Sequence, residues 1–342
     1  MKQRRTLARS SILRHKTTGV SISTPLLVPS FSSKDFIMDS KGISEINKIY
    51  NASLEYITDS MLISAYDIYY KNIKKPNYKT AEITIVDSGG YEASDDNDLS
   101  TVKYSAKTKK EWTEDMLFDV YQKIPANCPV ILVNYDHPKK WKKMRKQIND
   151  AKSLFQNFPS HLHTILIKPE TKIQKYIEIE SVLQYVKDLA NFDIIGFTEK
   201  ELGNSILTRM ITISNIRQAL DNEGILIPIH IYGSLDPITS ILYFISGAEI
   251  FDGLTWIRYG FLGGNACYYQ NYGARTSGID WDMDRTKLFM LNKNLFHLKK
   301  IKNQMKKFLV NEKFSVFGKE DELSQIIESS YNLLKASNGG IK

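Results

Sequence analysis

Short runs of β-branched and apolar residues recur along the chain, and polar residues, glycine or proline bound each of them. Runs of this kind are typical of strands that are buried on both faces. Eight of them are present, at residues 24–29, 60–65, 82–86, 129–134, 163–167, 192–197, 226–232 and 248–254. Most are separated from the next by a stretch long enough for a helix.

Helical patterns occupy the stretches between these runs. They lie at residues 113–124, 141–155, 173–189, 205–222 and 236–246, and two closing helices are expected at 285–310 and 321–336. Thr113 is suited to cap the first helix, because Glu114 and Asp115 follow it. The alternation of eight predicted strands with helices predicts an α/β fold, namely a (β/α)8 TIM barrel.

The same pattern assigns most of the chain to one domain. We expect a basic N-terminal arm over residues 1–16, the barrel over residues 17–310 and a C-terminal helical segment over residues 311–342. Residues 92–111 are polar, rich in lysine and without periodicity. A long loop over the mouth of the barrel is expected there.

Composition places the chain among globular proteins. It has 342 residues, 42% of them hydrophobic, and no window reaches the roughly 18 apolar residues that a membrane helix needs. A soluble, cytoplasmic protein without a membrane partner is therefore expected. Cys128 and Cys267 are too few for a disulfide framework and too far apart for a CxxC metal site, so both are expected to be free thiols.

The formal net charge of +8 is distributed unevenly. Basic residues crowd the first 16 positions, and the first acidic residue is Asp35. The densest later cluster surrounds Trp141 and consists of Lys139, Lys140, Lys142, Lys143, Arg145 and Lys146. A single basic run is usually a solvated face, whereas repeated runs favour a nucleic-acid partner. An acid-free start rich in arginine and serine is also typical of a transit peptide, although folded structure is expected from Thr17 onward.

Two of the predicted strands end in carboxylates with distinctive neighbours. One strand runs into Asp87-Ser88-Gly89-Gly90-Tyr91, where the double glycine lets backbone amides approach a flat ligand. Another ends in Phe251-Asp252-Gly253, with Arg258 six residues after the carboxylate. In a barrel these strand ends share the face that carries active sites. Two carboxylates at one mouth are the minimum for cleaving a glycosidic bond through a covalent intermediate.

The two motifs, taken together and in this order, resemble those of the tRNA-guanine transglycosylase superfamily. Further segments similar to the family lie at residues 23–29, 134–136, 196–201 and 232–237, so that the resemblance covers about residues 15–310. It implies a TIM barrel with an N-terminal β-hairpin extension and C-terminal helices. Trp141 and Trp256 are expected in the core or in a pocket wall rather than on a stacking platform.

The resemblance also implies roles for individual residues. Asp252 falls on the family's nucleophile and Asp87 on its acid/base residue, while Asp136 matches the carboxylate that reads the Watson–Crick edge of the base. Tyr91 and His230 fall on residues at the two faces of the base, although histidines are more often structural. Other expected contacts with the base involve Ser88, Gly89, Lys168, Gly196, Glu201 and Gly233. Contacts with the nucleic-acid backbone are expected from Arg258, Lys139, Lys140, Lys142 and Lys143.

The chain departs from the family pattern in two places. The cysteine run and the later histidine that hold the family's zinc are missing, and Lys293 stands where the histidine would align. No structural zinc and no other cofactor are therefore expected. Lys168 replaces a glutamine that the family keeps beside the base, which leaves the preference for a particular base open.

The family includes enzymes that act on tRNA and relatives that insert 7-deazaguanine bases into DNA. The two departures, the basic arm and the lack of an appended RNA-binding domain favour DNA. The expected activity is that of a pentosyltransferase, which exchanges guanine for a base such as 7-cyano-7-deazaguanine through a covalent glycosyl-aspartate. The alternatives are a queuosine-type tRNA enzyme, a catalytically silent partner subunit that binds nucleic acid, and a barrel glycosidase acting on free sugars. A homodimer or a partner subunit is compatible with the family.

Overall fold

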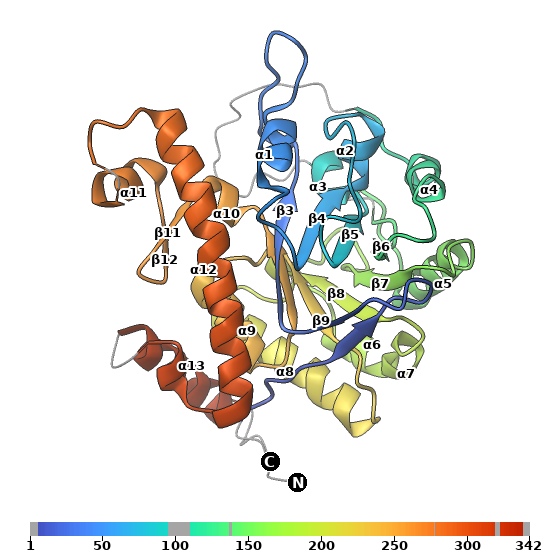
Figure 1. The fold of residues 1–342 in the computed structure, drawn as a ribbon. Helices are drawn as coiled ribbons and strands as arrows, with labels where there is room; N and C mark the ends of the chain where they lie inside the picture. Colours follow the sequence, from blue (N-terminus) through green and yellow to red (C-terminus); the bar gives the residue numbers. More distant parts are fainter. Residues whose placement is uncertain (1–5, 95–109, 137–138, 277, 319–321, 338–342) are drawn as a thin grey trace. The chain divides into compact units, whose positions relative to one another are not determined.

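Eight strands form a closed parallel barrel in the computed structural model of the chain (Figure 1). The structure describes residues 6–94, 110–136, 139–276, 278–318 and 322–337. The strands follow the order β10-β3-β4-β5-β6-β7-β8-β9. Their bounds are β3 Leu26–Phe31, β4 Ser60–Ser64, β5 Ile83–Asp87, β6 Val130–Val133, β7 Leu162–Ile167, β8 Ile194–Thr198, β9 Ile229–Tyr232 and β10 Ile250–Gly253. The α/β barrel class and all eight strands are thus confirmed.

The helices predicted from the periodicity are present, together with several that were not predicted. Their bounds are α1 Glu45–Ser53, α2 Ala65–Tyr69, α3 Gly90–Ala93, α4 Glu114–Gln122, α5 Met144–Phe155, α6 Ile179–Gln184, α7 Val186–Leu189, η1 Glu199–Glu201, α8 Ile206–Asn222, α9 Pro237–Ile245, α10 Thr255–Arg258, α11 Tyr269–Thr276, α12 Met283–Asn311, η2 Phe314–Val316 and α13 Glu322–Ser337. The Thr113 side chain accepts a hydrogen bond from the amide of Met116, which confirms the predicted cap of α4.

One predicted helix is shorter than expected. The helix predicted over residues 173–189 begins only at Ile179 and is interrupted at Tyr185, whose backbone is not helical. Ile173, the first residue of the predicted helix, is 94% exposed. Without burial of this side chain the first turns lose their apolar contact, and helices of this length depend on burial of an apolar face.

Two further small sheets complete the strands. β1 Ile12–Arg14 pairs with β2 Ser21–Ser23, and β11 Gly260–Leu262 pairs with β12 Asn265–Cys267. The chain divides into two compact units. Unit 1 contains residues 1–13, 23–29 and 178–342, and unit 2 contains residues 14–22 and 30–177.

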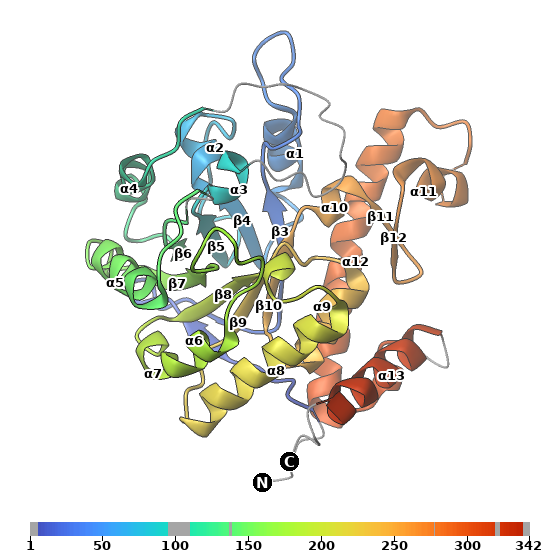
Figure 2. The same cartoon turned by 180° about the vertical axis from the view of Figure 1, so that it is seen from behind.

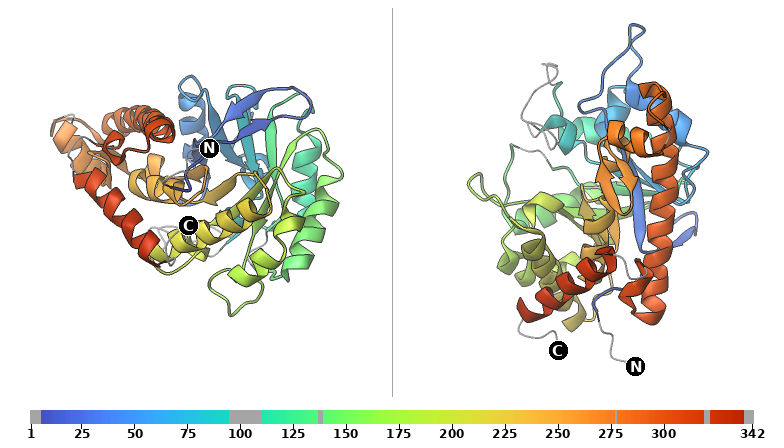
Figure 3. Two further views of the ribbon diagram at one scale, coloured as in Figure 1. Left: turned by 90° about the horizontal axis from the view of Figure 1, so that it is seen from below. Right: turned by 90° about the vertical axis from the view of Figure 1, so that its left-hand side faces the viewer.

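The C-terminal helices cover the outer helices of unit 1. α12 contacts α9, and α13 contacts both α8 and α9 (Figures 1 and 2). α12 also lies beside β11, as the side view in Figure 3 shows. Asn294 of α12 accepts a hydrogen bond from the amide of Phe261 at 2.8 Å and donates to the carbonyl of Trp256 at 2.7 Å. A buried side-chain amide thus ties α12 to α10 and β11.

A buried ionic network holds the N-terminal segment of unit 1. Arg217 is fully buried, and burial lowers its pKa to about 10. Its guanidinium bonds to Asp221, which also accepts a bidentate pair from Arg9 at 2.5 Å. The buried Glu249 accepts a hydrogen bond from Ser11 at 2.8 Å, so a second carboxylate contacts the same segment. Each buried charge therefore has hydrogen-bonding partners, as burial requires.

Other expectations from the sequence have mixed outcomes. Both cysteines are free thiols and Trp256 is fully buried, as predicted. The prediction for Trp141 was wrong: it is 40% exposed, because it precedes α5 and the described elements leave much of its ring uncovered. Residues 1–5 of the basic arm and residues 95–109 of the predicted loop lie outside the described residues. Among the residues that are described, no helix is long and apolar enough to span a bilayer.

Candidate active site

In unit 2, β5 ends at Asp87 and opens into the predicted double glycine. Gly89 has a φ of 82°, a left-handed conformation that favours glycine. A Cβ on Gly89 would lie 2.8 Å from the Cβ of Tyr66 and 2.9 Å from the ring of Trp112. The Trp112 indole N–H donates to the carbonyl of Ser88 at 2.8 Å. An aromatic wall therefore holds the turn in place, and only glycine fits at its centre.

The second glycine makes room for Asp136, three residues beyond the end of β6. A Cβ on Gly90 would lie 2.6 Å from Asp136 Oδ1. The Ser88 hydroxyl donates a hydrogen bond to the same oxygen. Ser88 is buried, and the Asp136 side chain is only 10% exposed. The Asp-Ser-Gly-Gly motif thus both admits this carboxylate and bonds to it.

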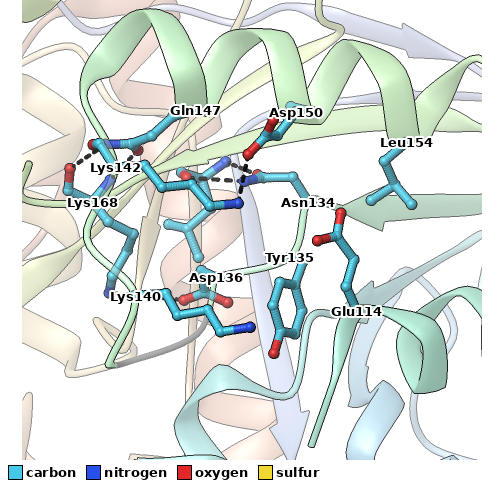
Figure 4. Close-up of a pocket in the computed structure, with 12 residues that line it drawn as sticks. Glu114, Asn134, Tyr135, Asp136, Lys140, Lys142, Gln147, Asp150, Leu154 and Lys168 are labelled. Carbon is cyan, nitrogen blue, oxygen red and sulfur yellow. Dashed lines mark hydrogen bonds and ion pairs between the residues drawn. The ribbon is translucent and has the colours of Figure 1, made fainter.

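Lys168 also points toward Asp136 (Figure 4). Its ammonium is 3.8 Å from Asp136 Oδ2. The side chain of Gln147 on α5 makes two hydrogen bonds with the backbone of Lys168. Its Oε1 accepts from the Lys168 N–H at 2.9 Å, and its Nε2 donates to the Lys168 carbonyl at 2.8 Å. We call Asp136, Ser88, Gly90 and Lys168 the Asp136 site. The sequence did not predict Gln147, because its contact joins two elements that only packing brings together.

A cavity of about 30 Å³ adjoins this site. Its lining includes Glu114, Asn134, Tyr135, Asp136, Lys140, Lys142, Gln147, Asp150, Leu154 and Lys168 (Figure 4). That volume holds water molecules and not a purine. The cavity is therefore too small to bind a base. Of the residues that line it, Asp136 and Lys168 have a predicted role in base recognition.

Carboxylates offset much of the basic cluster around Trp141. Lys142 and Lys146 lie 2.5 and 2.6 Å from Asp150, and Lys143 lies 3.4 Å from Glu170. Burial by itself would raise the pKa of Asp150, but the hydrogen bonds from the two lysines outweigh it, so the pKa is lowered. The sequence did not connect these acids with the cluster. Lys139 and Lys140 are exposed.

Tyr91 carries a lysine on one face of its ring. The ammonium of Lys34 lies 4.1 Å from the ring centroid and donates to the Tyr91 carbonyl at 2.8 Å. Such a cation–π contact stabilises the ring in one orientation. No sequence signal pointed to Lys34, which lies 57 residues before Tyr91.

Two buried carboxylates lie behind this turn in unit 2. Glu92 accepts hydrogen bonds from the hydroxyls of Ser32 and Ser64, and Asp67 accepts from the amide of Ser33 at 2.7 Å. Asn72 donates to Asp67 at 2.9 Å. Burial, together with the negative charge of Glu92, raises the pKa of Asp67 to about 7. These bonds anchor the segments on which the turn rests.

In unit 1, Asp252 lies on β10 and is 5% exposed. His230 on β9 is fully buried, and its Nε2 lies 3.0 Å from Asp252 Oδ1. The imidazole stacks on Tyr232 with the ring centroids 3.8 Å apart. We call Asp252, His230 and Tyr232 the Asp252 site. The sequence predicted His230 at a face of the base, and the structure adds a contact with the carboxylate that the sequence did not predict.

The remaining predicted residues of unit 1 lie within or at the ends of neighbouring elements. Gly196 on β8 pairs with His230, so a residue without a side chain stands beside the imidazole. Gly233 follows β9 with a φ of 79°. Glu201 ends η1 and Arg258 ends α10, both half-buried.

The sequence did not predict a partly buried cluster in this unit. Glu199 accepts hydrogen bonds from Arg209 at 2.9 Å and from the hydroxyl of Tyr243 at 2.8 Å. Burial raises the pKa of Glu199 despite these bonds. The three residues lie on η1, α8 and α9, and their contacts hold the segment that follows β8. Glu199 stands two residues before Glu201 in the strand-end motif, which was the only available signal.

No family model matches the chain, and no curated protein matches it either. In the part of the chain that the structure describes, no group of three or more His, Cys, Asp or Glu side chains could hold a metal ion. The site must therefore be interpreted from its own residues.

Proposed function

We propose that the protein is a base-exchange transglycosylase, which replaces guanine in DNA with a 7-deazaguanine base such as 7-cyano-7-deazaguanine. One observation carries the proposal. Strands of one parallel barrel bear both motifs: β5 ends in Asp87 before the double glycine, and β10 carries the buried Asp252. Active sites of such barrels use residues from the carboxyl ends of several strands.

The proposed reaction has two displacement steps at one sugar carbon. An oxygen of Asp252 forms a bond to C1′ while the C1′–N9 bond breaks, and its electron pair leaves with guanine, whose N9 takes a proton from Asp87. The incoming base gives its N9 proton to Asp87, and its N9 attacks C1′. The bond to Asp252 then breaks, and the electron pair returns to the carboxylate. The overall exchange needs no redox partner.

The Asp136 site supports recognition of a guanine-like base. A carboxylate accepts hydrogen bonds from the N1–H and 2-amino groups that guanine and 7-deazaguanines share. Lys168 adds a donor suited to the carbonyl on the same edge. Adenine offers the reverse pattern, with a donor in place of that carbonyl. The site therefore favours 2-amino-6-oxo bases.

DNA is proposed in preference to tRNA on two features of the chain. The cysteine run that holds zinc in the tRNA enzymes is missing, and Lys168 replaces their glutamine. In either nucleic acid the target nucleotide must leave its stack to expose C1′. The basic residues would bind the flanking phosphates, so binding would weaken steeply with salt.

Base incorporation tests the proposal. Purified protein is incubated with radiolabelled guanine or 7-cyano-7-deazaguanine and with duplex DNA or bulk tRNA, and Asp252→Ala serves as the inactive control. Label that enters DNA with the wild type and not with Asp252→Ala supports the proposal. Label that enters tRNA alone assigns the protein to the tRNA enzymes. No label in either nucleic acid contradicts an active transglycosylase and favours a silent partner subunit.

A further inference from the structure

We infer that His230 is a positioning residue for Asp252, which holds one carboxylate oxygen so that the other attacks C1′. The inference rests on the proposed function and adds to it the origin of the nucleophile's orientation. The contact joins two neighbouring strands, β9 and β10, within unit 1.

The protonation of His230 follows from its surroundings. Asp252 Oδ1 lies 3.0 Å from Nε2, and an ionised carboxylate oxygen can only accept, so Nε2 carries the hydrogen. The other nitrogen, Nδ1, is buried and has no hydrogen-bond partner among the described residues. A buried N–H without a partner on a charged ring is costlier than a buried lone pair. The imidazole is therefore neutral, and the pair keeps the negative charge that a nucleophile needs.

Stacking and burial restrict the imidazole. Tyr232 stacks on its ring with the two ring centroids 3.8 Å apart. His230 is fully buried, so water does not compete for Nε2. The carboxylate plane of Asp252 is thus held by a bond whose donor has little freedom to rotate.

The bond serves both steps of the exchange. In the free enzyme it orients the carboxylate through Oδ1, and we assign the attack on C1′ to Oδ2. In the glycosyl ester, Oδ1 becomes the carbonyl oxygen and still accepts from Nε2. When the ester breaks, the electron pair returns to a carboxylate that is already hydrogen-bonded. Because the contact acts on the reacting group and not on the bases, its loss lowers kcat rather than raising KM.

The hydrogen bond is tested without any substrate by ¹⁵N NMR of protein labelled at its six histidines. His230→Phe assigns the signals of His230 by their loss. We expect the neutral Nε2–H tautomer at pH 7 and a shift of these signals alone in Asp252→Asn. An unprotonated Nε2, or His230 chemical shifts that are the same in the wild type and in Asp252→Asn, would overturn the inference.

Two variants of His230 then test its role in the reaction. His230→Phe keeps a planar ring without a donor, whereas His230→Gln keeps an N–H near the position of Nε2. We expect His230→Phe to lower kcat about 10- to 100-fold, which is typical for a lost bond to a charged group, with KM within about twofold. His230→Gln should keep kcat within about fivefold of the wild type. His297→Phe replaces a histidine elsewhere in the same unit and should change neither constant.

The outcomes separate this inference from the proposed function. Equal losses in the phenylalanine and glutamine variants, or a wild-type rate for His230→Phe, would contradict a positioning role. Melting temperatures of both variants show whether either loss reflects unfolding. If the wild type exchanges no base at all, the proposed function fails, whereas the NMR experiment still decides whether His230 donates to Asp252.

Discussion

Two of the three carboxylates with a proposed role, Asp252 in unit 1 and Asp136 in unit 2, are held in different ways. Asp252 lies within a strand, and its partner His230 comes from the adjacent strand. Asp136 lies beyond the end of its strand, where the Ser88 hydroxyl and the more distant Lys168 ammonium contact it. The absence of a side chain at Gly90 leaves room for the same carboxylate.

This difference matches the chemistry that each carboxylate is proposed to perform. A nucleophile must keep its charge and its direction, and a neutral donor restrains Asp252 without neutralising it. A carboxylate that binds a base gains from a nearby cation and hydroxyl, which favour its ionised, hydrogen-accepting form. On the proposed function, we therefore expect changes at Asp252 to alter the rate and changes at Asp136 to alter base affinity.

The largest effect on the rate of base exchange is expected from a change at Asp252. Asp252→Asn keeps an acceptor for His230 but removes the nucleophilic charge, so we expect base exchange to fall by about 1,000-fold or more. Steady-state incorporation of labelled base measures this loss. Trapping of the covalent enzyme in a denaturing gel should fail with the variant. A covalent adduct on Asp252→Asn would assign the nucleophile to another residue.

Asp136→Asn should change KM rather than kcat. An amide in place of the carboxylate presents a donor to one of the two base N–H groups, and we expect KM for the incoming base to rise roughly 10- to 100-fold. The value of kcat should change much less, because this contact exists before and during the reaction. A loss confined to kcat would remove the distinction between the two carboxylates.

Lys168→Gln tests the cation in the Asp136 site and restores the residue that the resembled family keeps. The ion pair spans 3.8 Å and is partly exposed, so we expect less than about a fivefold change in KM. A competition experiment between guanine and 7-cyano-7-deazaguanine shows whether the ratio of the two incorporated bases differs between the variant and the wild type. An unchanged ratio would mean that Lys168 does not select the base.

The smallest expected effect concerns Asp67, the buried carboxylate behind the double-glycine turn. Its pKa in the folded protein is about 7, well above the ordinary value of 3.8. Because the folded pKa is raised, the stability that this group contributes is present at low pH and is lost as the pH rises through 7. We expect the melting temperature to fall between pH 5 and pH 8 by roughly 5 °C more in the wild type than in Asp67→Asn. Identical pH profiles would show that Asp67 does not titrate in this range.

The fold was largely predictable from the sequence because its signals are local. Each barrel strand is a short apolar run bounded by breakers, and Thr113 caps α4 through an amide three residues away. The helix predicted from residue 173 was wrong at its start because periodicity could not show that Ile173 would remain exposed. Trp141 was misplaced for the same reason.

Within the site, the sequence by itself determined which residues stand at strand ends. It placed Asp87 at the end of β5 and Asp252 on β10, and it supplied the double glycine that the turn requires. These are properties of a few consecutive residues. They depend on strand length and on backbone conformation, which neighbours along the chain control.

Only the tertiary structure decided which side chains meet. The contact of His230 with Asp252 spans 22 residues, and that of Ser88 with Asp136 spans 48. Gln147 reaches the backbone of Lys168 from a helix. Such contacts depend on strand register and on helix packing, because a shift of one residue turns a side chain to the opposite face of its strand. No local pattern records that register, so the partners of each carboxylate became known only when the strands were paired.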